Sequence, residues 1–302
     1  MKEVTVQVPA TTANIGPGFD CLGAALSLYN RFKFTLAENN SIELSGTQAQ
    51  GVFLDLSPNN LLYHSFLRLY QHIDHFAPTV KMSVEINVPL SRGLGSSATA
   101  IVGGLLAANA MAGNRLTKKE IRNLAISIEG HPDNVVPALL GNCQLSVGGP
   151  GNWQISQIQW HSDVVAILAI PDFKLSTEKA RAVLPNQYSR QDAIFNMSHL
   201  ALLIKGLETG NPKWLKESLQ DRLHQPYRQS LIPGYDAVYG AAMDAKAHGL
   251  VISGAGPTLL ALSAPDCSDG VSKAIEQAWQ IHGVKAEVMT LAIAPEGAMI
   301  ES

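Results

Sequence analysis

The stretch Pro89-Leu-Ser-Arg-Gly-Leu-Gly-Ser-Ser-Ala-Thr99 joins a strand-like segment to a helix-like one. Before it, apolar and polar residues alternate from 80 to 88, which is the period of a half-buried strand. After it, residues 98 to 111 are apolar or small on every side, which indicates a buried helix. Two glycines and two serines leave backbone N–H groups free at the start of that helix, where its dipole favours an anion. The stretch predicts a phosphate-binding loop, although a Gly/Ser-rich turn alone is also compatible with a simple tight connection.

The composition indicates a globular protein with a large core. At 302 residues the chain is long enough for two domains, and only 16% of residues are charged against 46% apolar. The net charge of −3 gives no basic surface for nucleic acid. Although no charge occurs between Arg92 and Arg115, five glycines and a polar loop interrupt this run, so we expect no membrane span.

The cysteines and the N-terminus both favour a cytoplasmic protein. Cys21, Cys143 and Cys267 are far apart and odd in number, which argues against a disulfide framework and a zinc site. The chain goes from Met1 directly into an alternating strand, so we expect no signal or transit peptide.

A polar loop is expected soon after the first strand. We predict a strand over residues 3 to 8 that ends at Pro9, followed by a glycine-bearing loop that holds Asn14 and Asp20 at its two ends. This amide and this carboxylate could grip a polar substrate, or they could simply cap turns of their own backbone.

Helices are predicted on both sides of the glycine loop. After strands over 30 to 37 and 41 to 46, a helix is expected over 60 to 76, with Phe76 on its apolar face and Asn60 as a cap. Thr117 and Glu120 form a capping box that starts another helix.

That later helix delivers Glu129 to the segment His131-Pro-Asp-Asn134, where Pro132 suits the first turn of a further helix. With the serines of the glycine loop, Glu129 would suit Mg²⁺, which is shared with phosphates. The competing interpretation is that these polar groups only cap helix ends.

The second half of the chain is expected to form its own domain. We place the domains at 1–157 and 158–302, with the last strand, 284 to 293, either closing the second domain or returning to the first. Thr177 and Arg181 lie four residues apart on one face of a predicted helix. We predict a break over 225 to 228, a helix over 232 to 247, and a hairpin over 249 to 263 around a Gly-Ala-Gly-Pro turn.

Three separated motifs resemble the GHMP family of small-molecule kinases. They are Ala-Asn-Ile-Gly-Pro-Gly-Phe-Asp at 13 to 20, Pro-x-x-x-Gly-Leu-Gly-Ser-Ser-Ala at 89 to 98, and Ser-Gly-Ala-Gly-Pro at 253 to 257. The first motif, His-Pro-Asp-Asn at 131 to 134 and Ser-Thr-x-x-Ala-Arg at 176 to 181 are most similar to the branch of that family that phosphorylates homoserine. Ala255 departs from the pattern, since relatives often have serine there.

The resemblance implies an α+β fold of two domains, with an N-terminal domain of the ribosomal protein S5 domain 2-like type and a ferredoxin-like C-terminal domain. It also implies ATP-dependent, magnesium-assisted phosphorylation of L-homoserine to O-phospho-L-homoserine in threonine biosynthesis, by a homodimer. Two alternatives are a GHMP kinase for another small alcohol, such as mevalonate or shikimate, and a GHMP-fold binding protein without turnover.

The resemblance further assigns residues to the site. It implies that Ser97 and Glu129 hold Mg²⁺ and that Asn134 and Thr177 act in catalysis. The implied homoserine pocket is Asn14, Asp20, His131, Arg181, Arg228 and Gly254. The implied nucleotide site is Asn60, Pro89, Leu90, Ser91, Arg92, Gly93, Leu94, Gly95, Ser96, Ser97, Ala98 and Thr99.

Chemistry supports the substrate assignment, because a zwitterion needs an arginine for its carboxylate and an anion such as Asp20 for its ammonium. In many relatives, an aspartate that can accept the hydroxyl proton occupies the position of Asn134. An amide cannot act as a base. We expect Asn134 to orient the hydroxyl while its proton leaves to a γ-phosphate oxygen or to water near Thr177. Asp133 is the neighbouring candidate base, but we expect it to brace the loop.

Overall fold

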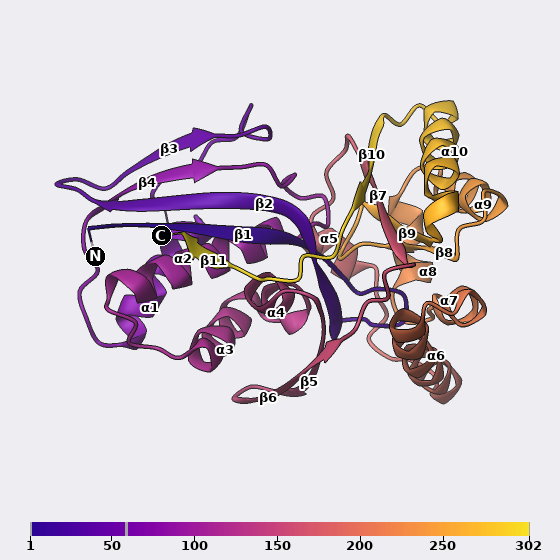
Figure 1. The fold of residues 1–302 in the computed structure, drawn as a ribbon, viewed down its shortest axis with the longest axis horizontal. Coiled ribbons are helices and arrows are strands. Elements are labelled where there is room, and N and C mark those ends of the chain that lie inside the picture. Colours follow the sequence, from indigo (N-terminus) through magenta and orange to yellow (C-terminus); the bar gives the residue numbers. More distant parts are fainter. Residues whose placement is uncertain (1, 58–59, 302) are drawn as a thin grey trace.

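The computed structural model describes residues 2–57 and 60–301, which form two α/β units lying side by side (Figure 1). In the first unit, helices cover one face of a sheet of order β11-β1-β2-β4-β3, to which β5 and β6 add a hairpin along β2. Its strands are β1 (Glu3–Ala13), β2 (Leu22–Leu36), β3 (Ser41–Ser45), β4 (Val80–Glu85), β5 (Cys143–Gly149), β6 (Asn152–Ile158) and the C-terminal β11 (Met299–Glu301). Its helices are α1 (Leu61–His72), α2 (Ser96–Met111), α3 (Lys118–Glu129) and α4 (Pro132–Leu140).

Strand β1 is longer than the sequence predicted. The expected end at Pro9 is wrong, because the strand continues to Ala13 in antiparallel pairing with β2. The register shifts between Pro9 and Ala10, and such a bulge lets a strand pass a proline that has no N–H to donate. The continuation carries Thr11 and Thr12 toward the phosphate loop.

Helix α1 ends earlier than predicted. Phe76 was expected on its apolar face but is fully exposed, because the helix stops at His72 and Asp74 adopts a left-handed backbone with φ 55°. Asn60 caps the helix as expected, since its Oδ1 accepts hydrogen bonds from the backbone of Leu62 and Tyr63.

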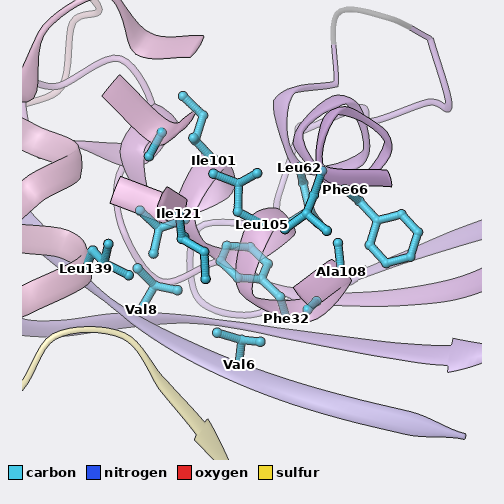
Figure 2. Close-up of a cluster of buried hydrophobic side chains, with 14 of the residues drawn as sticks. Val6, Val8, Phe32, Leu62, Phe66, Ile101, Leu105, Ala108, Ile121 and Leu139 are labelled. Carbon is cyan, nitrogen blue, oxygen red and sulfur yellow. The ribbon is translucent and has the colours of Figure 1, made fainter. Parts of the chain in front are cut away.

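The buried helix α2 lies between the sheet and the other helices. Figure 2 shows Ile101 and Leu105 of α2 among Phe32 of β2, Leu62 of α1 and Ile121 of α3. All of these side chains are at most 2% exposed, so the helix that follows the phosphate loop is held on several sides. The prediction of a helix buried all round is confirmed.

The second unit has a four-stranded antiparallel sheet of order β10-β7-β9-β8. Its strands are β7 (Val165–Pro171), β8 (Gly249–Ile252), β9 (Leu259–Ser263) and β10 (Ala286–Leu291). Its helices are α5 (Thr177–Ala182), α6 (Arg190–Thr209), α7 (Pro212–Ser218), α8 (Gln225–Arg228), α9 (Tyr235–Asp244) and α10 (Ser268–Ile281).

Two details of this unit differ from the sequence prediction. The expected break over 225 to 228 is wrong, because these residues form the single-turn helix α8, in whose first turn Pro226 is tolerated. The end of the chain has two strands instead of one: β10 pairs with β7, and the separate strand β11 returns to pair with β1.

A shared apolar core joins the two units. Leu22 and Leu94 of the first unit pack in one cluster with Leu168, Leu207 and Leu260 of the second. Because this junction is apolar and buried, it fixes the two units relative to each other, and with them the polar groups that meet beside it. No helix within the described ranges combines the length and apolar character that crossing a bilayer requires.

Candidate active site

The predicted phosphate-binding loop, residues 89 to 95, connects β4 to α2 and is shaped by glycines; we call it the phosphate loop. Gly93 and Gly95 have φ of 79° and 64°, and Gly95 is the N-cap of α2 without any side-chain cap. A Cβ on Gly95 would lie 1.9 Å from Thr11 Oγ1, and one on Gly93 would lie 2.2 Å from the carbonyl oxygen of Ser253. The loop is therefore pressed between β1 and a turn of the second unit, with the N–H groups of the first turn of α2 left for an anion.

Two cavities meet at this loop. A polar cavity of about 210 Å³ lies between the two units, and a more apolar cavity of about 380 Å³ lies beside α1 and β4. Ser91, Ser96 and Ser97 line both of them. An extended ligand could thus place an apolar end in one cavity and a phosphate tail across the loop into the other.

The predicted site residues divide between these cavities. Those that line the polar cavity are Asn14, Ser91, Gly93, Gly95, Ser96, Ser97, Glu129, His131, Asn134, Thr177, Arg181, Arg228 and Gly254. Those that line the apolar cavity are Asn60, Leu90, Ser91, Ser96, Ser97 and Thr99.

The remaining predicted residues have other surroundings. Leu94 and Ala98 are buried in the core behind the loop. Pro89 and Arg92 line a separate groove, and the Arg92 side chain donates to the carbonyl oxygens of Pro171 at 2.8 Å and Asp172 at 2.7 Å. Arg92 thus ties the loop to the second unit.

Ser97 and Glu129 form an oxygen pair at the floor of the polar cavity. Ser97 Oγ donates to Glu129 Oε1 at 2.6 Å. Glu129 is the last residue of α3, and Gly130 ends that helix with φ 92°. Burial raises the pKa of Glu129, opposed by the hydrogen bond from Ser97 and the charge of His131. A hydroxyl and a carboxylate beside a phosphate loop are the hard oxygen donors that suit Mg²⁺.

His131 and Asp133 interact through their side chains at the start of α4. His131 Nδ1 lies 2.5 Å from Asp133 Oδ1. Burial pushes the pKa of His131 down, but the hydrogen bond and charge of Asp133 outweigh it, so the pKa is raised. Asp133 is 1% exposed and lines the polar cavity, and its buried Oδ2 has no hydrogen-bond partner within the described part of the chain. The sequence analysis named Asp133 as a candidate base and expected it to brace the loop, but the state of its Oδ2 could be seen only in the three-dimensional structure.

The loop over 14 to 20 is closed by its own polar groups. Asn14 Oδ1 accepts from the backbone N–H of Asp20 at 2.7 Å, and Asn14 Nδ2 donates to the Gly254 carbonyl at 2.9 Å. Asp20 pairs with Arg181 through two hydrogen bonds of 2.7 and 3.0 Å. The hydrogen bond to Asp20 raises the pKa of Arg181. Asp20, predicted to hold the ammonium of a zwitterion, is therefore paired in this structure with Arg181, one of the two arginines of the predicted pocket.

Arg228 is the second arginine at the cavity, and its side chain is completely buried. Its Nε donates to Ala180 O, and its Nη1 donates to Gly254 O, both at 3.1 Å. Its Nη2 is buried and has no hydrogen-bond partner among the residues that the structure describes. Burial lowers the pKa of Arg228 to about 10, so the guanidinium stays charged at neutral pH. A buried cation with one open donor is suited to bind an anionic ligand.

Two aromatic rings that sequence reasoning missed support these cations. The ring of Phe19 lies 5.1 Å from the Arg228 guanidinium and 5.6 Å from that of Arg181, and it stacks on His224. Phe19 belongs to the motif at 13 to 20, and this membership could have identified it as a site residue from the sequence. His224 had no local signal, because its role depends on residues far away in the sequence.

The GHMP kinase family models match both units, the N-terminal model over residues 60–142 and the C-terminal model over 203–285. The chain is 56% identical to the homoserine kinase of Trichormus variabilis, with 99% of each protein covered. It is 58% identical to that of Nostoc punctiforme, covering 99% of this chain and 98% of the relative.

Solved structures agree in fold. A homoserine kinase from Cytophaga hutchinsonii aligns with a TM-score of 0.89 and 27% identity, covering 100% of this chain and 98% of that one. A mevalonate kinase from L. major aligns with a TM-score of 0.73 at 15% identity over 96% of each chain, which is a likeness of fold alone. The chain therefore belongs to the GHMP kinase family, in the branch of the homoserine kinases. The predicted two-domain α+β fold is confirmed.

Proposed function

We propose that this chain transfers the γ-phosphoryl group of ATP to the side-chain hydroxyl of L-homoserine, giving O-phospho-L-homoserine and ADP in threonine biosynthesis. The observation that carries the proposal is the polar cavity beside the phosphate loop, with a buried cation and buried acids on its walls. The near-complete alignment with homoserine kinases supports the same substrate.

The charges suggest how a zwitterion is recognised. Arg181 is already neutralised by Asp20, whereas Arg228 has an open Nη2. The substrate carboxylate therefore binds Arg228. The unpartnered Oδ2 of Asp133, with Asp20 nearby, receives the ammonium group. Both contacts fill hydrogen-bonding capacity that the protein leaves unused.

The character of the two cavities supports one direction for bound ATP. The adenine lies in the apolar cavity against Leu62 and near Asn60, and the phosphates cross the loop over Ser96 and Ser97. The γ-phosphate then reaches the polar cavity, where the helix start and the loop N–H groups stabilise its charge.

Ser97 and Glu129 are the residues that would hold Mg²⁺, because their oxygens already converge within 2.6 Å beside the phosphate loop. The ion would neutralise phosphate charge during transfer. Glu129→Gln is expected to raise the Mg²⁺ concentration that gives half-maximal activity by about tenfold or more. Glu120→Gln, at the other end of α3, is the matched control. An unchanged Mg²⁺ requirement in Glu129→Gln would remove this residue from the metal site.

The transfer itself needs positioning more than a strong base. The homoserine oxygen forms a bond to the γ-phosphorus while the bond to the β–γ bridging oxygen breaks, and ADP leaves with that electron pair. Asn134 orients the attacking hydroxyl. The hydroxyl proton leaves to a γ-phosphate oxygen or to water near Thr177, which is exposed at the cavity mouth.

The proposal includes a cytoplasmic homodimer. Three free thiols, Cys21, Cys143 and Cys267, support a reducing compartment. The dimer rests on the family resemblance and on the low share of charged residues. Light scattering of the purified protein should give twice the 32.3 kDa chain mass, and a monomer would contradict this part.

A coupled ADP-release assay tests the function. With MgATP, homoserine is expected to stimulate ADP release strongly, whereas mevalonate and shikimate, which have no ammonium for Asp133 and Asp20, should stimulate it little. A preference for either of these alcohols would favour a different GHMP kinase. Failure of calorimetry to detect MgATP binding would favour a binding protein without turnover.

A further inference from the structure

Asn134 lies in the first turn of α4, is 8% exposed and lines the polar cavity. Its Oδ1 accepts a hydrogen bond of 2.8 Å from the hydroxyl of Thr11, a residue 123 positions away in the sequence. A side-chain amide has one acceptor oxygen and one donor nitrogen. Because Thr11 already bonds to the oxygen, the nitrogen, with its two N–H donors, is the end of the amide that has more capacity left for a ligand.

Thr11 is held firmly in place. It lies in the continuation of β1 beyond the bulge, pairs with Ala25 of β2 and is fully buried. Its backbone N–H donates to the carbonyl oxygen of Leu94 in the phosphate loop at 3.1 Å. As a β-branched residue it also has a restricted side-chain rotamer. Burial and the hydrogen bond to Asn134 therefore hold the hydroxyl in one position in this structure.

That position is between the phosphate loop and Asn134. The missing Cβ of Gly95 is what makes room for the Thr11 hydroxyl, since a Cβ there would lie 1.9 Å from Oγ1 and 3.1 Å from Asn134 Oδ1. One hydroxyl thus sets the spacing between the start of α2, which cradles phosphate, and the amide that faces the acceptor.

We infer that Thr11 is a positioning residue for phosphoryl transfer: its buried hydroxyl fixes the Asn134 amide so that Nδ2 faces the acceptor alcohol. This inference rests on the proposed kinase function. It has a chemical consequence, because Nδ2 donates to the alcohol oxygen and the alcohol's own proton must then point elsewhere. The orientation therefore directs that proton toward the γ-phosphate or solvent.

A double-mutant cycle in homoserine-dependent turnover tests the inference. Thr11→Val keeps the shape and removes the hydroxyl, and it is expected to lower kcat by about tenfold or more with the KM for ATP within about twofold. Thr11→Ser should restore most of kcat. On the Asn134→Ala background, Thr11→Val should cost almost nothing further, because the amide it positions is gone.

Thr12→Val is the matched control. Thr12 is the next residue of the same strand and is equally buried, but its Oγ1 lies 2.8 Å from Ser253 Oγ and not against Asn134. Any fold-decrease in kcat caused by Thr12→Val should be the same in the wild type and on the Asn134→Ala background, because the two side chains act independently. The inference would be overturned if the fold-decreases in kcat of Thr11→Val and Asn134→Ala multiplied in the double variant. It would also be overturned if Thr11→Ser had as low a kcat as Thr11→Val.

A second measurement does not depend on turnover. The side-chain amide of Asn134, followed by NMR, should shift and exchange faster with solvent in Thr11→Val but not in Thr12→Val. An unchanged Asn134 amide in Thr11→Val would contradict the positioning role even in an active kinase. If the wild type does not phosphorylate homoserine, the proposed function fails, and this amide measurement still decides whether Thr11 holds Asn134.

Discussion

Arg228 combines complete burial, a retained charge and one open donor at the polar cavity. Arg228→Lys keeps a positive charge but loses the planar fork. Losing a charged hydrogen bond should raise the KM for homoserine by about 10- to 100-fold, with little change in the KM for ATP. Steady-state kinetics against both substrates checks this. Arg222→Lys, at an exposed arginine over Phe195, is the control; equal effects of the two variants would contradict the assignment.

His224 makes stability depend on pH. Burial lowers its pKa, and the charge of Arg228 adds to this, while the charge of Asp221 opposes both. The ring lies between the Gly16 carbonyl, 2.8 Å from Nε2, and the Arg228 guanidinium, 3.4 Å from Nδ1. Below about pH 6.5 the unfolded chain binds a proton here that the folded chain does not, so acid favours unfolding.

We expect the free energy of unfolding to fall more steeply with acidification in the wild type than in His224→Gln, by at most about 1.4 kcal/mol per pH unit. Urea titrations at several pH values check this prediction. His282→Gln, at an exposed histidine, should keep the wild-type slope. Parallel slopes in wild type and His224→Gln would show that folding does not lower the pKa of His224.

At the level of residues, the sequence indicated which side chains gather but not how they pair. The motif at 13 to 20 and the helix at 177 to 182 were each recognisable locally. That Asp20 would hold Arg181, leaving Arg228 as the open cation, depends on contacts 161 and 26 positions apart, which no local pattern encodes.

At the level of elements, the phosphate loop depends on glycine for space as well as for backbone conformation. Gly95→Ala would place a Cβ 1.9 Å from Thr11 Oγ1, so the loop must move away from β1. We expect a large loss of MgATP affinity by calorimetry together with a lower melting temperature.

Gly113→Ala separates the two causes. Gly113 also has a positive φ, 83°, but a Cβ there would meet nothing within 4 Å. This variant should show only the backbone cost, about 1 to 2 kcal/mol, with normal MgATP affinity. Similar MgATP affinities for the two variants would argue against a close-packed loop.

Elements with local signals were predicted well. The capping box of Thr117 and Glu120 starts α3 as expected, and the all-apolar composition of α2 matches its burial. The errors at Pro9, Phe76 and residues 225 to 228 share one cause. In each case the surrounding structure overrode the local preference of a proline or an apolar residue. Strand pairing did so at Pro9, an early left-handed turn did so before Phe76, and the first turn of a helix did so at residues 225 to 228.

At the level of the whole molecule, the site exists only because two units meet. The loop over 14 to 20 and the phosphate loop come from the first unit, while Arg181, Arg228 and Gly254 come from the second. The shared apolar core fixes these parts relative to one another. The sequence could predict the two units and their motifs, whereas the shape of the cavity between them required the three-dimensional structure.

The proposed function requires that this cavity recognise both charges of homoserine while presenting its hydroxyl to ATP. The most direct test is phosphorus NMR of reactions with MgATP and one of three alcohols: L-homoserine, 4-hydroxybutyrate without the amine, or 3-amino-1-propanol without the carboxylate. We predict a phosphate monoester with homoserine and a rate lower by about 100-fold or more for each analogue. Equal rates for all three alcohols, or no monoester with homoserine, would show that the cavity does not recognise homoserine in this way.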